Sequence, residues 1–208
     1  MKKLFGVFTL FTALFFAFPA WTMAIPPDKL VNQTVQEVIE IVRQDEDIKE
    51  GNNSQKILDL VENKILPHFN FVRMTRLAMG KNWRKANAEQ QDVIVDEFRD
   101  LLVRTYSNTL SKYQNERIIV SPLKTLSDNN EATVNTEVIQ GRGKRPVPID
   151  YNMEKTADGW KVYDVIVSGV SLVMNYRSSF NNQISKDGVD GLIKTLVEKN
   201  QALEEKYK

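Results

Sequence analysis

The stretch NAEQQDVIVDEFRDLLVRTYSNTLSKY, residues 87–113, sets the frame for the rest of the chain. Asn87 and Gln90 have the spacing of a capping box, in which each side chain accepts a hydrogen bond from the other residue's backbone N–H. The residues that follow repeat every three or four positions, the period of one face of an α-helix. This stripe consists of Ile94, Phe98, Leu101, Leu102, Thr105, Tyr106, Thr109, Leu110 and Tyr113. The stretch therefore predicts a long helix over residues 87–113.

Beyond Gln114 the period of the apolar residues changes from about 3.6 to 2, the period of a β-strand. Turn residues at 141–144 and at Asp158-Gly159 separate the alternating segments, as in hairpins. Because Pro146 and Pro148 cannot donate to a ladder, the strand that they begin is expected at an edge, at least at its start. We expect four strands, over residues 117–120, 132–139, 147–153 and 160–167.

The last of these strands is expected to present two different faces. One face would hold Lys161, Tyr163, Val165 and Val167, and the other Trp160, Val162, Asp164 and Ile166.

Helical periods return on both sides of the sheet. Before residue 87 they run over three segments, 31–42, 57–65 and 70–80. Pro67 ends the second segment, and Asn70 can cap the third. After the sheet they run over 172–184 and 192–197, separated at Asp187-Gly188. The order of helices, antiparallel strands and helices predicts an α+β fold, with a four-stranded sheet packed on a long helix. An apolar space between sheet and helix would be the place to look for function.

The N-terminus has the three-part layout of a secretory signal peptide. Lys2 and Lys3 precede about 15 uncharged residues, and Thr22 and Ala24 stand at the −3 and −1 positions of a cleavage site. The apolar run is shorter than the roughly 20 residues of a spanning helix, although an uncleaved anchor is the alternative. We therefore expect residues 1–24 to be removed on export and residues 25–208 to form one domain that is free in solution.

The composition excludes several function classes. A net charge of +1, or about −1 after loss of Lys2 and Lys3, lacks the basic excess of a general nucleic-acid binder. The chain has no Cys and one His, which argues against disulfides, thiol catalysis and a transition-metal site.

The candidate catalytic groups have ordinary structural explanations. His68 stands alone after Pro67, and Ser171 lies outside a G-x-S-x-G motif, so a capping or surface role suits both. Asp150 and Asp164 are the plausible general bases, although strand carboxylates usually face solvent. We expect no catalytic residue and no cofactor. An enzyme that acts on a small apolar substrate, and a periplasmic adapter or chaperone, are the alternatives.

Two clusters of basic residues could meet a phosphate or an acidic protein surface, or could be ordinary solvated charge. One cluster surrounds Gly80 and the other lies at a hairpin turn. Their members are Arg73, Arg76, Lys81 and Arg84, and then Arg142, Lys144 and Arg145.

Several segments together resemble the MlaC family. They are RMTRLAMGKNWR at 73–84, the central helix around Phe98 to Tyr106, GWKVYDV at 159–165, GVSL at 169–172 and DGL at 190–192. Members of this family are periplasmic phospholipid-binding components of an ABC transport system that maintains outer-membrane lipid asymmetry; they are also called toluene-tolerance proteins.

The resemblance implies a fold related to the cone-shaped NTF2-like type, with an added helical part. It implies a deep apolar pocket for the acyl chains, with the headgroup at the mouth and phospholipid as cargo. The implied partners are an inner-membrane ABC transporter complex with MCE domains and an outer-membrane lipoprotein–porin complex.

Position alone suggests which residues line such a pocket, although some of them would be plain core. The candidates are Phe98, Leu102, Tyr106 and Leu110 on the long helix, with Val134, Val138, Val147, Ile149, Tyr151, Val165 and Val167 on the sheet.

Overall fold

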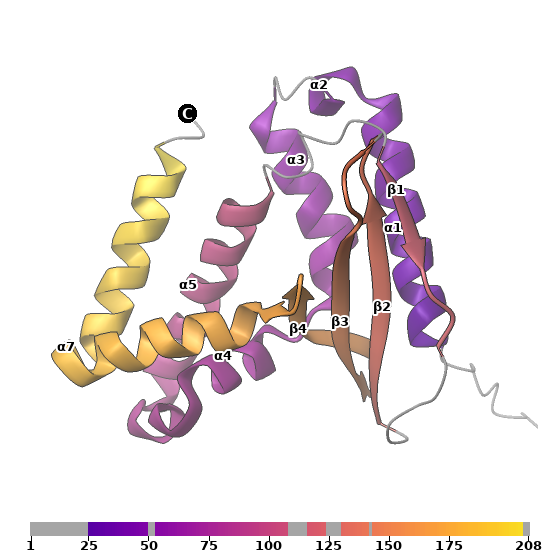
Figure 1. Cartoon of the computed structure of the whole chain (residues 1–208). Helices are drawn as coiled ribbons and strands as arrows, with labels where there is room; N and C mark the ends of the chain where they lie inside the picture. Colours follow the sequence, from indigo (N-terminus) through magenta and orange to yellow (C-terminus); the bar gives the residue numbers. More distant parts are fainter. Residues whose placement is uncertain (1–24, 50–52, 108–115, 124–129, 142, 206–208) are drawn as a thin grey trace, which may run out of the picture.

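The computed structural model describes residues 25–49, 53–107, 116–123, 130–141 and 143–205. The expected signal peptide and residue Leu110 lie outside these ranges. Figure 1 shows a sheet with α1 along one side and a body of helices, α4, α5 and α7, on the other. The helices are α1 Pro27–Gln44, α2 Glu46–Lys49, α3 Ser54–Leu60, the π-helical η1 Val61–Ile65, the 3₁₀ segment η2 Leu66–His68, α4 Phe71–Met79, the 3₁₀ segment η3 Gly80–Lys85, α5 Ala88–Tyr106 and α7 Leu172–Glu204. The strands are β1 Arg117–Val120, β2 Glu131–Ile139, β3 Val147–Thr156, β4 Gly159–Val167 and β5 Val170–Ser171.

Polar side chains cap several of the described helices, and the sequence predicts three of these caps, Asn70, Asn87 and Ser171. Each accepts a hydrogen bond from the backbone N–H three residues further on, and so satisfies a donor that the helix leaves free. The caps are Asn53 for α3 at 3.1 Å, Asn70 for α4 at 3.0 Å, Asn87 for α5 at 2.9 Å and Ser171 for α7 at 3.0 Å. The capping box of Asn87 and Gln90 is complete.

The sheet is an antiparallel meander in the order β1-β2-β3-β4-β5. The α+β class is confirmed, but the sheet has five strands where the sequence predicted four. The additional strand β5 turns back on β4 and pairs Val170 with Val167. Ser168 (φ 50°) and Gly169 (φ 83°) both have positive φ, as a tight type I′ hairpin turn requires.

A β-bulge at Tyr163 changes the faces of β4. Asn152 pairs with Asp164 and Met153 with Val162, so Tyr163 is an extra residue without a partner on β3. The predicted faces of this strand were therefore wrong, because strict alternation fails across a bulge. One face holds Trp160, Val162, Val165 and Val167, and the other holds Lys161, Tyr163, Asp164 and Ile166.

Buried side chains form separate clusters. The helical cluster is built by α4, α5 and α7 and contains Ile94, Phe98, Leu101, Leu102, Val173, Phe180, Leu192 and Leu196. The sheet cluster joins the sheet to α1 through Val31, Ala132, Val134, Met153, Trp160 and Val162. A third, smaller cluster joins α1, α2 and α3 through Val38, Val42, Ile48, Ile57 and Leu60. The long helix that contacts the sheet is α7, next to β4 and β5, whereas α5 packs mainly on α4 and α7.

Helix α7 bends at Gly188, where the sequence predicts a break. The backbone there has φ 72° and ψ −171°, which lies outside the helical region. Among the residues described, no helix is both long and apolar enough to cross a lipid bilayer.

Candidate functional site

The two faces of the sheet differ in polarity. One face carries paired polar side chains: Thr133 donates to Asn152 at 2.8 Å, and Asn135 donates to Asp150 at 2.8 Å. The register places apolar side chains on the opposite face, which α1 covers in part. An apolar ligand can therefore bind favourably on only one side of the sheet, the side that carries the apolar side chains.

Burial on the apolar face changes along the strands. At one end lies the filled half, whose side chains are buried in the sheet cluster: Ala132, Val134, Met153, Trp160 and Val162. At the other end lies the open half, whose side chains keep contact with solvent: Val138, Val147, Ile149, Tyr151, Val165 and Val167. Apolar side chains that share a face with the core yet remain accessible are typical of a ligand-binding surface.

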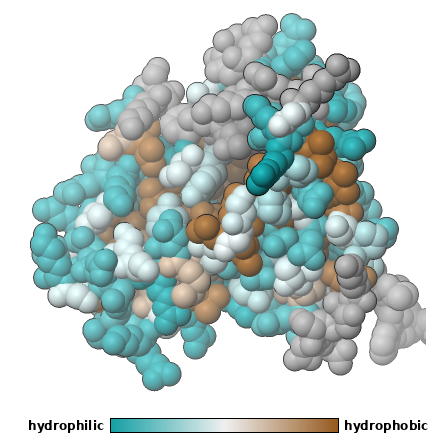
Figure 2. Space-filling view, in the orientation of Figure 1, coloured by the Kyte–Doolittle hydropathy of each residue, from teal (hydrophilic) through white to brown (hydrophobic). Residues whose placement is uncertain are grey.

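The open half continues over the β4–β5 hairpin. Val167 is 38% exposed, its partner Val170 is 62% exposed, and Met174 in the first turn of α7 is 53% exposed. Figure 2 shows apolar side chains gathered in the middle of this view, where the ends of β4 and β5 lie in Figure 1. Val170 and Met174 were not predicted from the sequence; the signal for them was an apolar residue on either side of the Ser171 cap.

Tyr151 brings a polar group to the open half. Burial raises the pKa of Tyr151, although a hydrogen bond with Thr136 opposes that shift. The phenol is therefore neutral at ordinary pH and makes its hydrogen bond within the sheet. Such a surface offers dispersion contacts and few directional bonds.

The candidates on the long helix lie elsewhere. Phe98 and Leu102 are buried in the helical cluster, where the Phe98 ring lies 4.9 Å from Tyr176 and 5.1 Å from Phe180. Tyr106 is 43% exposed and is hydrogen-bonded to Tyr176. The structure thus brings the candidates of β2, β3 and β4 together on one face, and holds Phe98 and Leu102 in a different cluster.

The candidate general bases are engaged in structural bonds. Asp164 is buried and accepts hydrogen bonds from the Ser171 hydroxyl at 2.6 Å and from the Val173 N–H at 3.1 Å. Asp150 accepts from Asn135. Burial and the nearby Lys161 lower the pKa of His68, so this imidazole is neutral at neutral pH. In the described part of the chain no three His, Cys, Asp or Glu side chains are grouped to hold a metal ion.

Arg73 ties α4 to the polar face of the sheet. Its guanidinium pairs with Glu131 at 2.6 Å and with Glu154 at 2.5 Å, and it lies 3.6 Å from the centre of the Tyr163 ring. Burial alone would lower the pKa of Arg73, but the two carboxylates outweigh it and raise the value. The bulge makes this contact possible, because it turns Tyr163 toward the helices.

The sequence profile of the MlaC protein family matches residues 32–198, most of the chain. The chain belongs to the MlaC family. The resemblance noted from the sequence alone is therefore confirmed.

Relatives from other bacteria agree with the MlaC assignment. The intermembrane phospholipid transport system binding protein MlaC of Haemophilus influenzae is 26% identical over 196 residues, which cover 93% of this chain and 91% of that protein. Toluene tolerance protein ttg2D of Pseudomonas putida is 28% identical over 176 residues, covering 84% and 80%.

A solved structure of a phospholipid-binding protein from Ralstonia solanacearum, in complex with a phospholipid, has the same fold. It is 39% identical in sequence, superposes with a TM-score of 0.76, and the match covers 84% of this MlaC chain and 97% of the Ralstonia chain.

Proposed function

We propose that this protein carries phospholipid and holds the acyl chains against the open half of the apolar face. The observation that carries the proposal is this accessible apolar surface, in a chain 39% identical to a protein solved with a phospholipid bound. The residues proposed to contact the acyl chains are Val138, Val147, Ile149, Tyr151, Val165 and Val167, and now also Val170.

The energetics of lipid transfer support such a surface. A diacyl lipid has about 30 methylenes, each of which costs about 0.8 kcal/mol to expose to water. The sum exceeds roughly 20 kcal/mol, so unaided transfer through water is slow. A carrier therefore has to cover the acyl chains and still release them. Many weak apolar contacts satisfy both needs better than a few strong directional bonds.

The other predicted members of the site remain proposals. Val134 would extend the contact into the filled half, and Tyr106 and Leu110 would approach the lipid from the end of the long helix. Phe98 and Leu102 would support the site from the helical cluster, to which they belong.

The setting of the carrier follows from the family. We propose that residues 1–24 direct export and that residues 25–208 work as a soluble periplasmic protein. Its partners would be an inner-membrane ABC transporter complex with MCE domains and an outer-membrane lipoprotein–porin complex. Movement of lipid between these complexes would maintain the asymmetry of the outer membrane. No bond is made or broken in this cycle, so no catalytic residue is assigned.

Native mass spectrometry tests the proposal directly. The protein would be purified from periplasm without detergent, and its mass compared with that of the polypeptide. We expect excess mass that solvent extraction resolves into phospholipid. A bare polypeptide mass, together with no uptake of labelled lipid from vesicles, would contradict the carrier function.

A further inference from the structure

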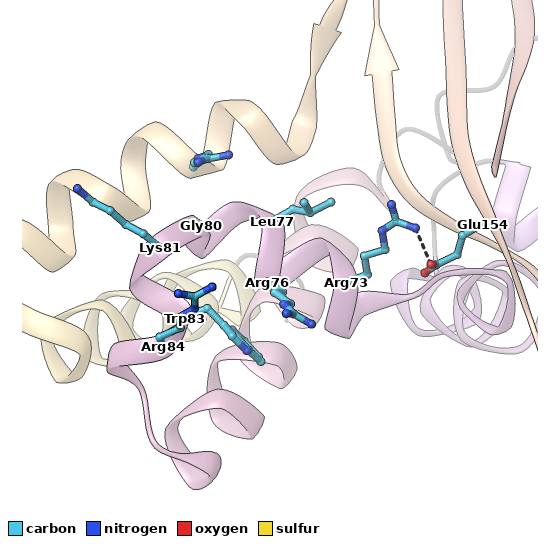
Figure 3. Close-up of a pocket in the computed structure, with 9 residues that line it drawn as sticks. Arg73, Arg76, Leu77, Gly80, Lys81, Trp83, Arg84 and Glu154 are labelled. Carbon is cyan, nitrogen blue, oxygen red and sulfur yellow. Dashed lines mark hydrogen bonds and ion pairs between the residues drawn. The ribbon is translucent and has the colours of Figure 1, made fainter. Parts of the chain in front are cut away.

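Cationic side chains surround the corner between α4 and η3. A hollow of about 620 Å³ at this corner is lined by Arg76 of α4, Lys81 and Arg84 of η3 and Arg177 of α7. Leu77 and Trp83 add apolar surface. Figure 3 shows Arg84 and Lys81 around the turn at Gly80, with Arg73 directed the other way, to Glu154. We call the hollow lined by these four cations the cationic pocket.

Within the described residues, the four cations of the cationic pocket have no carboxylate of their own. The one described acidic residue that lines the pocket is Glu154, whose carboxylate is already bound by Arg73 at 2.5 Å and by Asn70 at 2.7 Å. Among the described residues, no ion pair joins any of these four cations to an acidic side chain. Cations held together without anions repel one another, so the fold itself gains nothing from this grouping.

The backbone at Gly80 brings the cations of α7 and η3 together. Gly80 has φ +56°, and a Cβ built there would lie 3.0 Å from the Arg177 guanidinium. The absence of a side chain therefore lets Arg177 lie over the turn, beside the cations of η3. The positive φ at Gly80 favours glycine, and Arg177 occupies the space that the missing side chain leaves. The resulting group of like charges points to an external anion.

The shape of the site favours a protein partner over a bilayer. A guanidinium binds a carboxylate through two parallel hydrogen bonds, and Arg and Trp are the residue types enriched at the energetic centres of protein interfaces. A hollow with cations on several sides encloses a protruding acidic side chain, whereas a flat bilayer would meet only the outermost groups. Leu77 and Trp83 supply the apolar contact that a protein segment can fill.

We propose that the cationic pocket is a docking surface for an acidic segment of a protein partner. The proposal rests on the proposed function only in that a carrier needs a partner to receive its cargo. The pocket lies apart from the open half of the apolar face, so docking and lipid retention can be measured separately.

The test uses purified, lipid-loaded protein and a fluorescent synthetic peptide of glutamate and serine residues, with a glutamine-and-serine peptide as its neutral analogue. R76E with R84E reverses two cations of the pocket. K29E with K199E is the matched control, because both lysines are exposed, lie outside the pocket and change the charge by the same amount. We expect the glutamate peptide to bind at low ionic strength, to bind about tenfold or more weakly to R76E/R84E, and to bind K29E/K199E nearly as well as the parent.

Three results would overturn the proposal: no binding of the glutamate peptide, equal weakening in both double variants, or equal binding of the neutral peptide. Cosedimentation with phosphatidylglycerol vesicles that R76E/R84E alone abolishes, without peptide binding, would assign the pocket to a membrane surface instead. Native mass spectrometry of every variant checks folding and cargo. Lipid retained by R76E/R84E separates a docking defect from failure of the carrier function.

Discussion

Asp164 on β4 accepts a 2.6 Å hydrogen bond from the hydroxyl of Ser171, which itself caps the first turn of α7. The second carboxylate oxygen of Asp164 accepts from the Val173 N–H at 3.1 Å. One buried side chain thus joins the sheet to the longest helix through the β4–β5 hairpin. The hydrogen bonds of Asp164 consequently fix the β4–β5 hairpin and the first turn of α7, which carry the exposed Val170 and Met174.

Removal of the Asp164 carboxylate should destabilise the protein. Asp164→Ala leaves the Val173 N–H and the Ser171 hydroxyl without their acceptor, at a cost of about 1–3 kcal/mol. Urea denaturation would measure the change in the free energy of unfolding. Asp158→Ala, at the exposed turn before the same strand, is the control and should change stability by less than about 0.5 kcal/mol. Equal effects of the two substitutions would contradict the structural role of Asp164.

A charge on the open half should weaken lipid retention. Val165→Asp would place a carboxylate against the acyl chains, where an unpaired polar group costs about 1–3 kcal/mol, which is about 5-fold to 150-fold in binding. Lipid content would be read by native mass spectrometry after purification. Thr133→Asp, exposed on the polar face of β2, should keep its lipid. Unchanged lipid in a folded Val165→Asp protein would remove Val165 from the site.

The kink of α7 should depend on Gly188. Its φ of 72° and ψ of −171° lie in a region that only glycine adopts without strain, so Gly188→Ala should cost about 1–3 kcal/mol. A built Cβ meets no atom within 4 Å there, so the effect would come from the backbone alone. Gly141→Ala, where φ is not positive, is the control and should be neutral or slightly stabilising. Chemical denaturation of both variants decides whether the conformation at Gly188 is required.

Alkaline pH should destabilise the fold through Tyr176. Burial, with a smaller contribution from Tyr106, raises the pKa of Tyr176 to about 12 from its ordinary value of 10.0. Above pH 10 the unfolded chain therefore loses this proton first, so the stability that Tyr176 contributes is complete below pH 10 and is lost as the pH rises through about 12. Tyr176→Phe should show a smaller loss over this interval in unfolding experiments at stepped pH. Identical pH profiles would show that Tyr176 titrates normally.

Local chemistry made the helix ends predictable. Asn70, Asn87 and Ser171 bond to backbone groups only three residues away, so their effect does not depend on the rest of the fold. The period change after Gln114 likewise identified the sheet and with it the α+β class. These signals are contained within short windows of sequence.

The errors arose where distant segments decide the outcome. The residues around Tyr163 contain no pattern that predicts a bulge there. The bulged Tyr163 contacts Arg73, which lies on α4, far away in the sequence. The pair Val170 and Ser171 is too short for alternation to reveal a strand. The apolar stripe of the long helix could have packed against the sheet or against other helices. Tertiary packing decides between the two, and in the structure the stripe packs against α7. Which apolar residues contact lipid therefore stays a prediction for the sheet and for the helix alike.

The division of the interior into separate clusters has a consequence for a protein that must give up its contents. The helical cluster is filled by its own side chains, and Ile94 and Phe98 are wholly buried in it. In the proposed carrier, the open half of the sheet would instead exchange acyl chains for water each time the lipid leaves. Because stability and the proposed lipid contact rest on different groups of residues, release of the lipid would expose one surface to water and leave the helical cluster buried. The emptied protein would therefore be able to take up another lipid without first having to refold.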